Sequence, residues 1–190
     1  MKALRYVRLL PAALVLIATM TGAASARVRE TVNQVYDTDS SPRVSIRNIN
    51  GDLSIASWDQ KRIEIIAVKS ADDPDDLAKI EIRSRMDDGY LRIDVKYEDD
   101  DQWSDGRDMP AVDLAINVPR GTRIDDVELV NGDIRISDVR GDVDASSVNG
   151  TVEGDHLGGD VALSAVNGTV SLQATNDVKS IRLNSVNGGV

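Results

Sequence analysis

The chain has 190 residues, with 32 acidic against 22 basic side chains and a formal net charge of −10 at pH 7. This excess of negative charge repels nucleic acid and anionic lipid, so neither is expected as a partner. Cysteine is absent, which excludes disulfides, thiolate chemistry and cysteine-based zinc sites. Phenylalanine is absent too, so the core must consist of Val, Ile, Leu and Ala, which suit narrow sheet interiors.

Residues 1–26 have the layout of a secretory signal peptide. A basic start at 2–8 precedes an apolar run at 9–20, and a small-residue cleavage site stands at 24–26. The apolar run is too short for a spanning helix, which needs about 18 residues or more. We therefore expect an exported chain that begins at residue 27, resides in the periplasm or cell envelope, and has no membrane span after cleavage.

Residues 27–118 are expected to form an N-terminal region of β-strands that leads into a repeat region. Within it, residues 27–41 fit either an edge strand or a mobile lead-in. The Asp-Asp-Gly turn that ends at Gly89 predicts a hairpin with positive φ at the glycine, and Pro74 begins one helical turn. Residues 98–110 are the most polar and should form an exposed loop. The predicted strands are residues 43–49, 53–58, 62–69, 80–86, 90–97 and 112–118.

Residues 119–190 contain a repeat of nine-residue units. Val-Asn-Gly recurs with its asparagine at Asn131, Asn149, Asn167 and Asn187, in steps of 18, 18 and 20 residues. Apolar residues at unit positions four and six form one face of a short strand, and glycine at position two permits a sharp corner. The chain is therefore predicted to be all-β, with a parallel β-solenoid of nine-residue half-coils and 18–20 residues per coil.

A further unit stands far upstream, because residues 49–58 (INGDLSIASW) have the same pattern. Stacked coils place equivalent residues about 4.8 Å apart. The four repeat asparagines should therefore form a ladder in which each amide bonds to the next. A ligand groove lined by amides is the alternative to this structural ladder. The structural ladder is favoured, because asparagine also tolerates the left-handed backbone angles found at corners.

Three stretches together resemble a known family: RVSIRNINGDLSIASWD, VDLAINVPRGT, and the serial VNGD and VNGT units with RGDV and GGDV between them. They resemble the bacterial adhesin-type family of unknown function called DUF4097, from Val44 to the end of the chain. The resemblance implies an exported, envelope-associated β-solenoid with no established enzymatic activity, and it transfers no catalytic residue. Members of that family usually continue for further coils. We therefore expect either that the last coil of residues 119–190 is exposed or that these residues form a shortened version of the solenoid found in that family.

A pair of carboxylates is the strongest candidate for chemistry. Asp142 and Asp160 stand one period apart and should stack, with Asp144 two residues along the strand. Carboxylates that lie close together share a proton, bind a cation or turn into water. A polysaccharide lyase also needs a basic residue on that face, and Arg140 is nearby. Trp103, in the acidic loop, would stack on a sugar ring if exposed, and packing against the sheet is the alternative.

Other chemistry finds little support. His156 is the only histidine, and it occupies an outward, variable unit position. The acidic loops fit neither the ligand pattern of an EF-hand nor the glycine-rich nonapeptide of calcium β-rolls. No catalytic residue, cofactor or metal site is therefore assigned.

Three functional hypotheses follow from these patterns. The leading one is a non-catalytic envelope protein, an adhesin-like binding or structural β-solenoid whose faces or open end contact an envelope protein or glycan. The alternative is a carbohydrate-binding or carbohydrate-cleaving solenoid that uses Asp142, Asp144 and Asp160. The third is a structural element that self-associates end to end.

Overall fold

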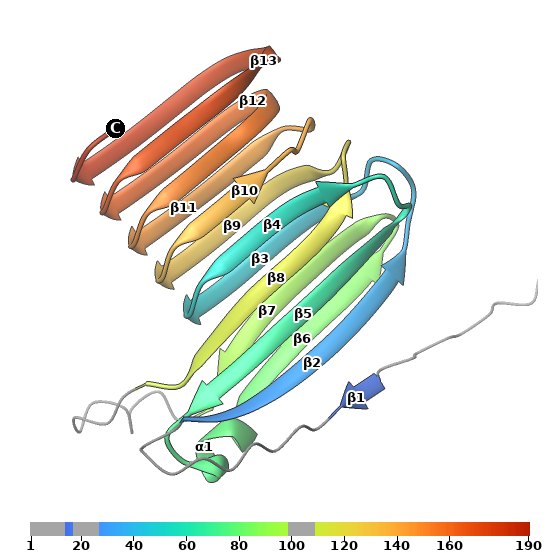
Figure 1. Cartoon of the computed structure of the whole chain (residues 1–190), viewed down its shortest axis with the longest axis vertical. Helices are drawn as coiled ribbons and strands as arrows, with labels where there is room; N and C mark the ends of the chain where they lie inside the picture. The colour runs from blue at the N-terminus through green and yellow to red at the C-terminus, as the bar shows by residue number, and fades with distance from the viewer. Residues whose placement is uncertain (1–13, 17–26, 99–108) are drawn as a thin grey trace, which may run out of the picture.

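The computed structural model describes residues 14–16, 27–98 and 109–190, which form strands and one short helix (Figure 1). Most of the predicted signal peptide, and Trp103, lie outside the described residues. The strands are β1 (Leu14–Leu16), β2 (Val28–Asp37), β3 (Arg43–Asn50), β4 (Leu53–Trp58), β5 (Arg62–Ala71), β6 (Ile80–Asp87), β7 (Tyr90–Tyr97), β8 (Ala111–Pro119), β9 (Arg123–Asn131), β10 (Ile134–Ser137), β11 (Val143–Asn149), β12 (Val152–Asn167) and β13 (Val170–Asn187). The helix α1 spans Pro74–Ala78. The prediction of an all-β chain is confirmed.

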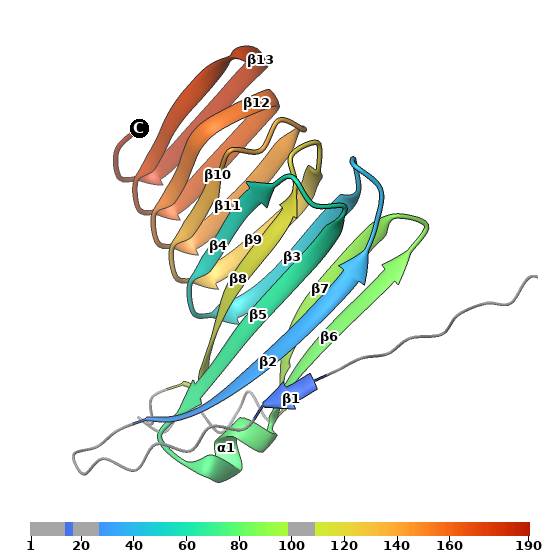
Figure 2. The same cartoon turned by 45° about the vertical axis from the view of Figure 1, so that its right-hand side comes forward.

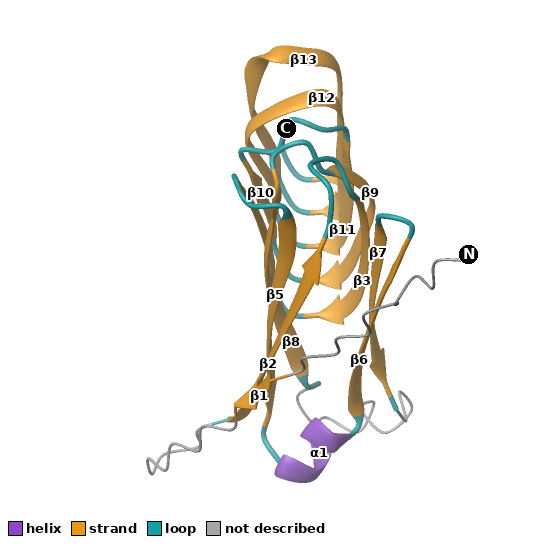
Figure 3. Ribbon diagram, turned by 90° about the vertical axis from the view of Figure 1, so that its right-hand side faces the viewer, coloured by secondary structure: helices purple, strands orange, loops and turns teal. Residues whose placement is uncertain are grey.

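These strands form one mixed sheet that folds into a nearly closed, barrel-like structure with two facing layers (Figure 2, Figure 3). The hydrogen-bonded order is β1-β2-β5-β8-β4-β10-β12-β11-β9-β3-β7-β6, with β13 beside β12. Strand β12 passes through both layers, because its residues 152–155 pair with β10 and its residues 161–167 pair with β11. Near the edges of the sheet, the hydroxyl oxygen of Tyr36 on β2 lies 2.6 Å from Ser84 Oγ on β6. This side-chain contact links β2 and β6, which belong to opposite layers.

The repeat units stack in parallel with the register that their period predicts. Ile134 of β10 lies between Leu53 of β4 and Val152 of β12. In the other layer, Val143 of β11 lies opposite Val161 of β12. The upstream unit at 49–58 is confirmed as part of this stack, because β3 pairs with β9 and β4 pairs with β10. A unit separated by some 80 residues in sequence therefore contributes the neighbouring coil.

The interior is aliphatic because alternate residues of each stacked strand point inward. Ile46, Ile55, Ile134 and Ile136 are at most 1% exposed, and they belong to one continuous buried cluster. Tyr97 is the aromatic member of that cluster. Each of these large side chains contributes about 1.5–3 kcal/mol to folding through burial. The expected core of Val, Ile, Leu and Ala is thus confirmed, with Tyr97 as an addition.

Residues 59–98 and 109–122 stand in the sequence between β4 and β9, and they complete one end of the described structure. Strand β7 lies beside β3 and β8 lies beside β4, both in parallel, whereas β5 and β6 pair antiparallel with β8 and β7. The Asp73 side chain caps α1 by accepting a hydrogen bond from the Asp75 amide at 2.9 Å. The β6–β7 hairpin turns at Asp88 and Gly89, with φ of 46° and 73°. The predicted positive φ at the hairpin glycine is confirmed.

Candidate binding surfaces

The four repeat asparagines lie in a column at one corner of the stack. The side-chain amide of Asn149 donates to Asn131 Oδ1 at 2.8 Å, Asn167 donates to Asn149 at 2.9 Å, and Asn187 donates to Asn167 at 2.9 Å. Each side-chain amide oxygen in the column except the last therefore accepts a hydrogen bond from the asparagine of the next coil. Hydrogen bonds of this kind leave few free groups for a ligand, so the column is a structural ladder.

Aspartates at unit position three form a second kind of ladder. Asp52 Oδ1 accepts a hydrogen bond from the Asp133 amide at 2.9 Å, and Asp133 Oδ1 accepts one from the Thr151 amide at 2.8 Å. At the opposite corner, Asp142 Oδ1 accepts from the Asp160 amide at 3.0 Å. An Asp in one coil therefore satisfies a backbone N–H in the next coil, because corner amides lack a strand partner there.

The structure brings Asp142 and Asp160 together, but the contact joins the Asp142 carboxylate to the Asp160 backbone amide and does not pair the two carboxylates. The second carboxylate oxygen of Asp142, Oδ2, accepts hydrogen bonds from Arg123 Nη2 at 2.5 Å and from Arg123 Nε at 3.1 Å. The hydrogen bond from the Asp160 amide and the one from Arg123 hold the pKa of Asp142 below its usual range. Asp160 Oδ1 in turn accepts a hydrogen bond from Ser180 Oγ at 2.9 Å. Both oxygens of Asp142 are therefore engaged in holding adjacent coils.

Asp144, on β11, stands two residues after Asp142 and has different surroundings. Desolvation by neighbouring residues and the nearby charge of Asp126 raise its pKa, and Arg182 opposes this rise. Asp144 nevertheless remains solvent-exposed. Arg123, Asp142, Asp144, Asp160 and Arg182 line a shallow cavity of about 180 Å³. We call this outer surface, formed by β6, β7, β3, β9, β11 and residues 161–167 and 180–187, the charged face.

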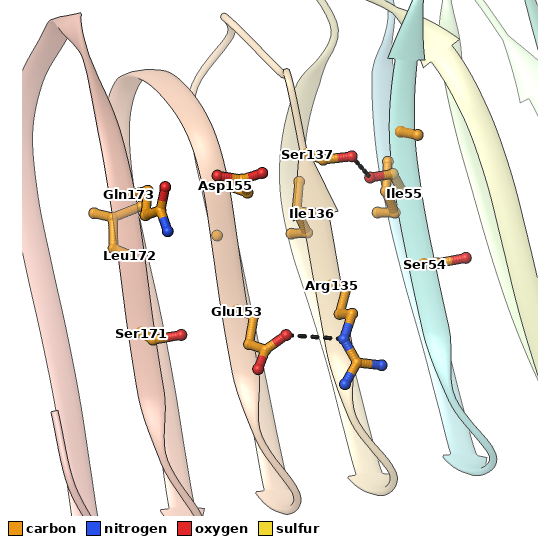
Figure 4. Close-up of a pocket in the computed structure, with 12 residues that line it drawn as sticks. Ser54, Ile55, Arg135, Ile136, Ser137, Glu153, Asp155, Ser171, Leu172 and Gln173 are labelled. Carbon is orange, nitrogen blue, oxygen red and sulfur yellow. Dashed lines mark hydrogen bonds and ion pairs between the residues drawn. The ribbon is translucent and has the colours of Figure 1, made fainter.

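The other layer carries a larger depression, which we call the groove. It has a volume of about 560 Å³ and crosses β4, β10, β12 and β13 (Figure 4). Glu153 receives a hydrogen bond from Arg135 Nε at 2.8 Å on one side of the groove. Ser54, Ser171 and Gln173 place hydroxyl and amide groups along it. We call the outer surface of these strands, with residues 152–155 and 170–173, the groove face.

Two arginines of the charged face and the whole groove were not predicted from the repeat. Arg123 stands 19 residues before Asp142, one more than the 18-residue step, and the two meet because the register of β9 with β11 shifts between the pairs Val143–Ile124 and Ala145–Val127. The last coil is 20 residues long, so Arg182 pairs with Ala162, outside an 18-residue step. A search that allowed one or two extra residues per coil would have found both arginines. Arg140, which was expected near this face, does not line the cavity.

The remaining candidates have ordinary surroundings. His156 is on the surface as expected, with φ of 52° and its Nδ1 3.1 Å from Asp155 Oδ1. Trp58 is half-buried at the end of β4, where its Nε1 donates to the carbonyl of Arg62 at 2.9 Å. Within the described ranges, no three His, Asp or Glu side chains gather closely enough to hold a metal ion. The described part of the chain also has no helix of the length and hydropathy that a membrane crossing requires.

Comparisons with known proteins find distant similarity to solved structures and no similarity to a family model or a curated sequence. Membership of the family suggested by the sequence therefore stays a prediction. A putative cell adhesion protein from Clostridium sporogenes has 10% identity and a TM-score of 0.47, over 84% of this chain and 100% of that chain. A putative lipid binding protein from Parabacteroides distasonis has 12% identity and a TM-score of 0.41, over 83% and 61%. A putative adhesin from Bacteroides fragilis has 11% identity and a TM-score of 0.37, over 84% and 96%. Likeness at this level carries no functional argument.

Proposed function

We propose that the protein is an exported, non-catalytic β-solenoid of the cell envelope that binds a polar polymer, such as an envelope glycan, through its groove. The solenoid proposal is supported by the parallel register, in which Leu53, Ile134, Val152 and Val170 stack at one interior position. Export is supported by the signal-peptide layout of residues 1–26. N-terminal sequencing of the envelope-extracted protein tests export, because cleavage would leave a chain that begins at residue 27.

The groove on the outer surface is the observation that carries the binding proposal. Its volume of about 560 Å³ lies within the range of about 300–1,000 Å³ that is typical of ligand sites. Hydroxyl, amide, carboxylate and guanidinium groups line it, and these are the partners that sugar hydroxyls use in hydrogen bonds. Successive coils repeat such groups at intervals of about 4.8 Å, so the groove suits an extended polymer.

The bonding of Asp142 argues for binding without catalysis. A general acid needs a pKa close to the working pH. The pKa of Asp142 is lowered, and both of its carboxylate oxygens accept hydrogen bonds from Asp160 and Arg123. Protonation of Asp142 would therefore break contacts between coils.

A glycan array, combined with a groove-filling variant, tests the binding proposal. Ser54 points outward on β4, so Ser54→Trp should fill the groove and leave the core unchanged. We expect at least about a tenfold loss of glycan binding, in line with a lost contact of about 1.4 kcal/mol. Ser164→Trp is the matched control, because Ser164 lies on β12 in the charged face, opposite Ser146. Failure of the unmodified protein to bind any bacterial glycan, or equal loss in both variants, contradicts the proposal.

Carbohydrate cleavage on the charged face is the second candidate, and the raised pKa of Asp144 favours it. A carboxyl group with a raised pKa beside Arg182, in a cavity of about 180 Å³, has the elements of an acid and an electrostatic stabiliser. Release of reducing ends from bacterial polysaccharides is the measurement. Cleavage requires that Asp144→Asn abolish this release. A release that persists unchanged in Asp144→Asn rules out the site.

A further inference from the structure

A group of arginines stands at the end of the charged face that lies furthest from the C-terminal coil. Arg85 on β6 is directly opposite Arg92 on β7. Arg92 is in turn opposite Ser45 on β3, and Tyr90 on β7 is opposite Arg43 on β3. These side chains alternate along their strands with buried residues on β3 and β7 and with half-buried residues on β6, so they all point outward. They therefore form one outward cluster on three adjacent strands.

Acidic partners neutralise some of these arginines, whereas Arg85 has one long ion pair and Arg92 has none with the described residues. Arg83 binds Glu81 at 2.5 Å, and Arg43 binds Asp125 at 2.5 Å. Arg85 has only a distant contact, its Nη2 standing 3.8 Å from Asp87, and its side chain is 80% exposed. Arg92 makes no ion pair with any described residue, and its guanidinium stacks on the Tyr90 ring. The other charged groups on β6, β7, β3 and the neighbouring β9 near this cluster are Glu81, Arg83, Asp87, Asp94, Arg43, Arg47, Asp125, Asp126 and Glu128.

Tyr90 holds two of the guanidinium groups in place. The Arg92 guanidinium carbon lies 4.0 Å from the ring centroid, and that of Arg43 lies 4.8 Å from it. Stacking on an aromatic ring restricts the rotation of a guanidinium but leaves its N–H groups free to donate. The donors of Arg92 are therefore oriented before any ligand arrives.

The opposition of Arg85 and Arg92 is unfavourable unless an anion joins them. Like charges directly opposite each other on neighbouring strands destabilise a sheet. Guanidinium groups donate parallel pairs of hydrogen bonds to oxyanions, and the Ser45 hydroxyl lies next in register on the same surface. We propose that Arg85, Arg92 and Ser45 form a binding site for a phosphate group. This site lies on a different layer from the groove, so it stands or falls separately from the proposed glycan binding.

Inorganic phosphate is the probe for this site. The purified full chain is titrated with phosphate, with ionic strength held constant by sodium chloride, and thermal stability and binding heat are measured. We expect saturable stabilisation by phosphate that chloride does not reproduce. Arg92→Gln should weaken phosphate binding at least tenfold. Arg83→Gln is the matched control, because Arg83 is on the same face but already paired with Glu81, and it should change binding less than twofold.

Arg85→Gln separates a binding site from a purely structural cluster. Without phosphate, this variant should be as stable as the unmodified chain or more stable, because it removes the like charge opposite Arg92. With phosphate, it should lose most of the stabilisation. A phosphate response that is the same in the unmodified chain, Arg85→Gln and Arg92→Gln overturns the proposal, as does the absence of any response.

Vesicle flotation identifies where the phosphate group comes from. Vesicles of phosphatidylglycerol carry it on a lipid headgroup, and phosphatidylcholine vesicles provide the zwitterionic control. Flotation with phosphatidylglycerol that is lost in Arg92→Gln supports a lipid source. A response to free phosphate without flotation supports a soluble or glycan-borne phosphate, because the net charge of −10 repels an anionic membrane.

Discussion

The side-chain amide of Asn149 donates to the Asn131 oxygen at 2.8 Å and its oxygen accepts from Asn167 at 2.9 Å, so one residue joins three coils. Such a residue stabilises the stack without contributing to the core. We expect Asn149→Leu to lower the free energy of unfolding by about 1–2 kcal/mol, through the loss of two exposed hydrogen bonds between side chains. Chemical denaturation measures the change. Asn184→Leu is the control, because the Asn184 side chain is exposed on β13 and makes no hydrogen bond with the described residues; equal destabilisation would contradict a ladder role.

The corner glycines should tolerate substitution even less than the asparagines. A Cβ atom at Gly150 would lie 1.9 Å from the carbonyl oxygen of Gly132, so the backbone of two coils must separate to accept it. We expect Gly150→Ala to lower the melting temperature strongly, with a loss of at least about 3 kcal/mol, because overpacking against rigid backbone is costly. Gly189→Ala is the control, since its Cβ would meet nothing within 4 Å. A Gly150→Ala variant as stable as Gly189→Ala would exclude this close approach.

The repeat predicted the stack well, because a constant period determines which residues become neighbours. Position nine of the unit is apolar in successive units, but the structure gives it two different environments. Val139 and Leu157 are fully buried, whereas Val148 and Val166 are 39% and 41% exposed. The two corners of each coil differ, one formed by Asn-Gly and the other by Arg-Gly or Gly-Gly. Apolar residues therefore turn inward before one corner and outward before the other, in keeping with the predicted full period of two units.

Contacts between charged groups on strands that neither the repeat nor a hairpin joins could not be predicted. The hairpin with its turn at Gly89 places Arg85 opposite Arg92, but Arg92 meets Ser45 only because β7 lies beside β3. No period links these strands in sequence. Arg123 reaches Asp142 through the irregular register between β9 and β11. Short turns and equal steps are readable from sequence, whereas register shifts and long-range pairings are set by the packing of the whole sheet.

The lowered pKa of Asp142 predicts a specific dependence of stability on pH. The pKa of this carboxyl is lower in the folded chain than its unfolded value of about 3.9. The ionised group therefore stabilises the fold above that pH, and the contribution is lost as the pH falls through the folded value. At pH 7 we expect Asp142→Asn to be less stable than the unmodified chain by up to about 1 kcal/mol. Denaturation at a series of pH values should show this difference shrinking below pH 4.

Asp144 should behave in the opposite sense. Its pKa is raised by desolvation, so the fold disfavours its ionised form, and the cost is fully present above the folded pKa. Asp144→Asn should therefore leave stability unchanged or raise it slightly at pH 7, and the gain should disappear at pH 3. The same denaturation series compares both variants. A loss of stability at pH 7 in Asp144→Asn would show that this carboxylate is paired in the folded chain.

The contact between Tyr36 and Ser84 predicts how the two layers are held together near β2 and β6. The two hydroxyl oxygens are 2.6 Å apart, and Ser84 Oγ also hydrogen-bonds Gln34 Oε1 on β2. Tyr36→Phe removes the hydroxyl and keeps the ring, so it should lower the free energy of unfolding by about 0.5–1.5 kcal/mol. Hydrogen exchange should quicken in β2 and β6 more than in β11 and β12, since local opening at the edges becomes easier. Tyr90→Phe is the control, because the Tyr90 hydroxyl makes no hydrogen bond with the described residues and its ring still stacks on Arg92. Uniform quickening across all strands, or an equal effect of Tyr90→Phe, would show that the two edges are not joined by this contact.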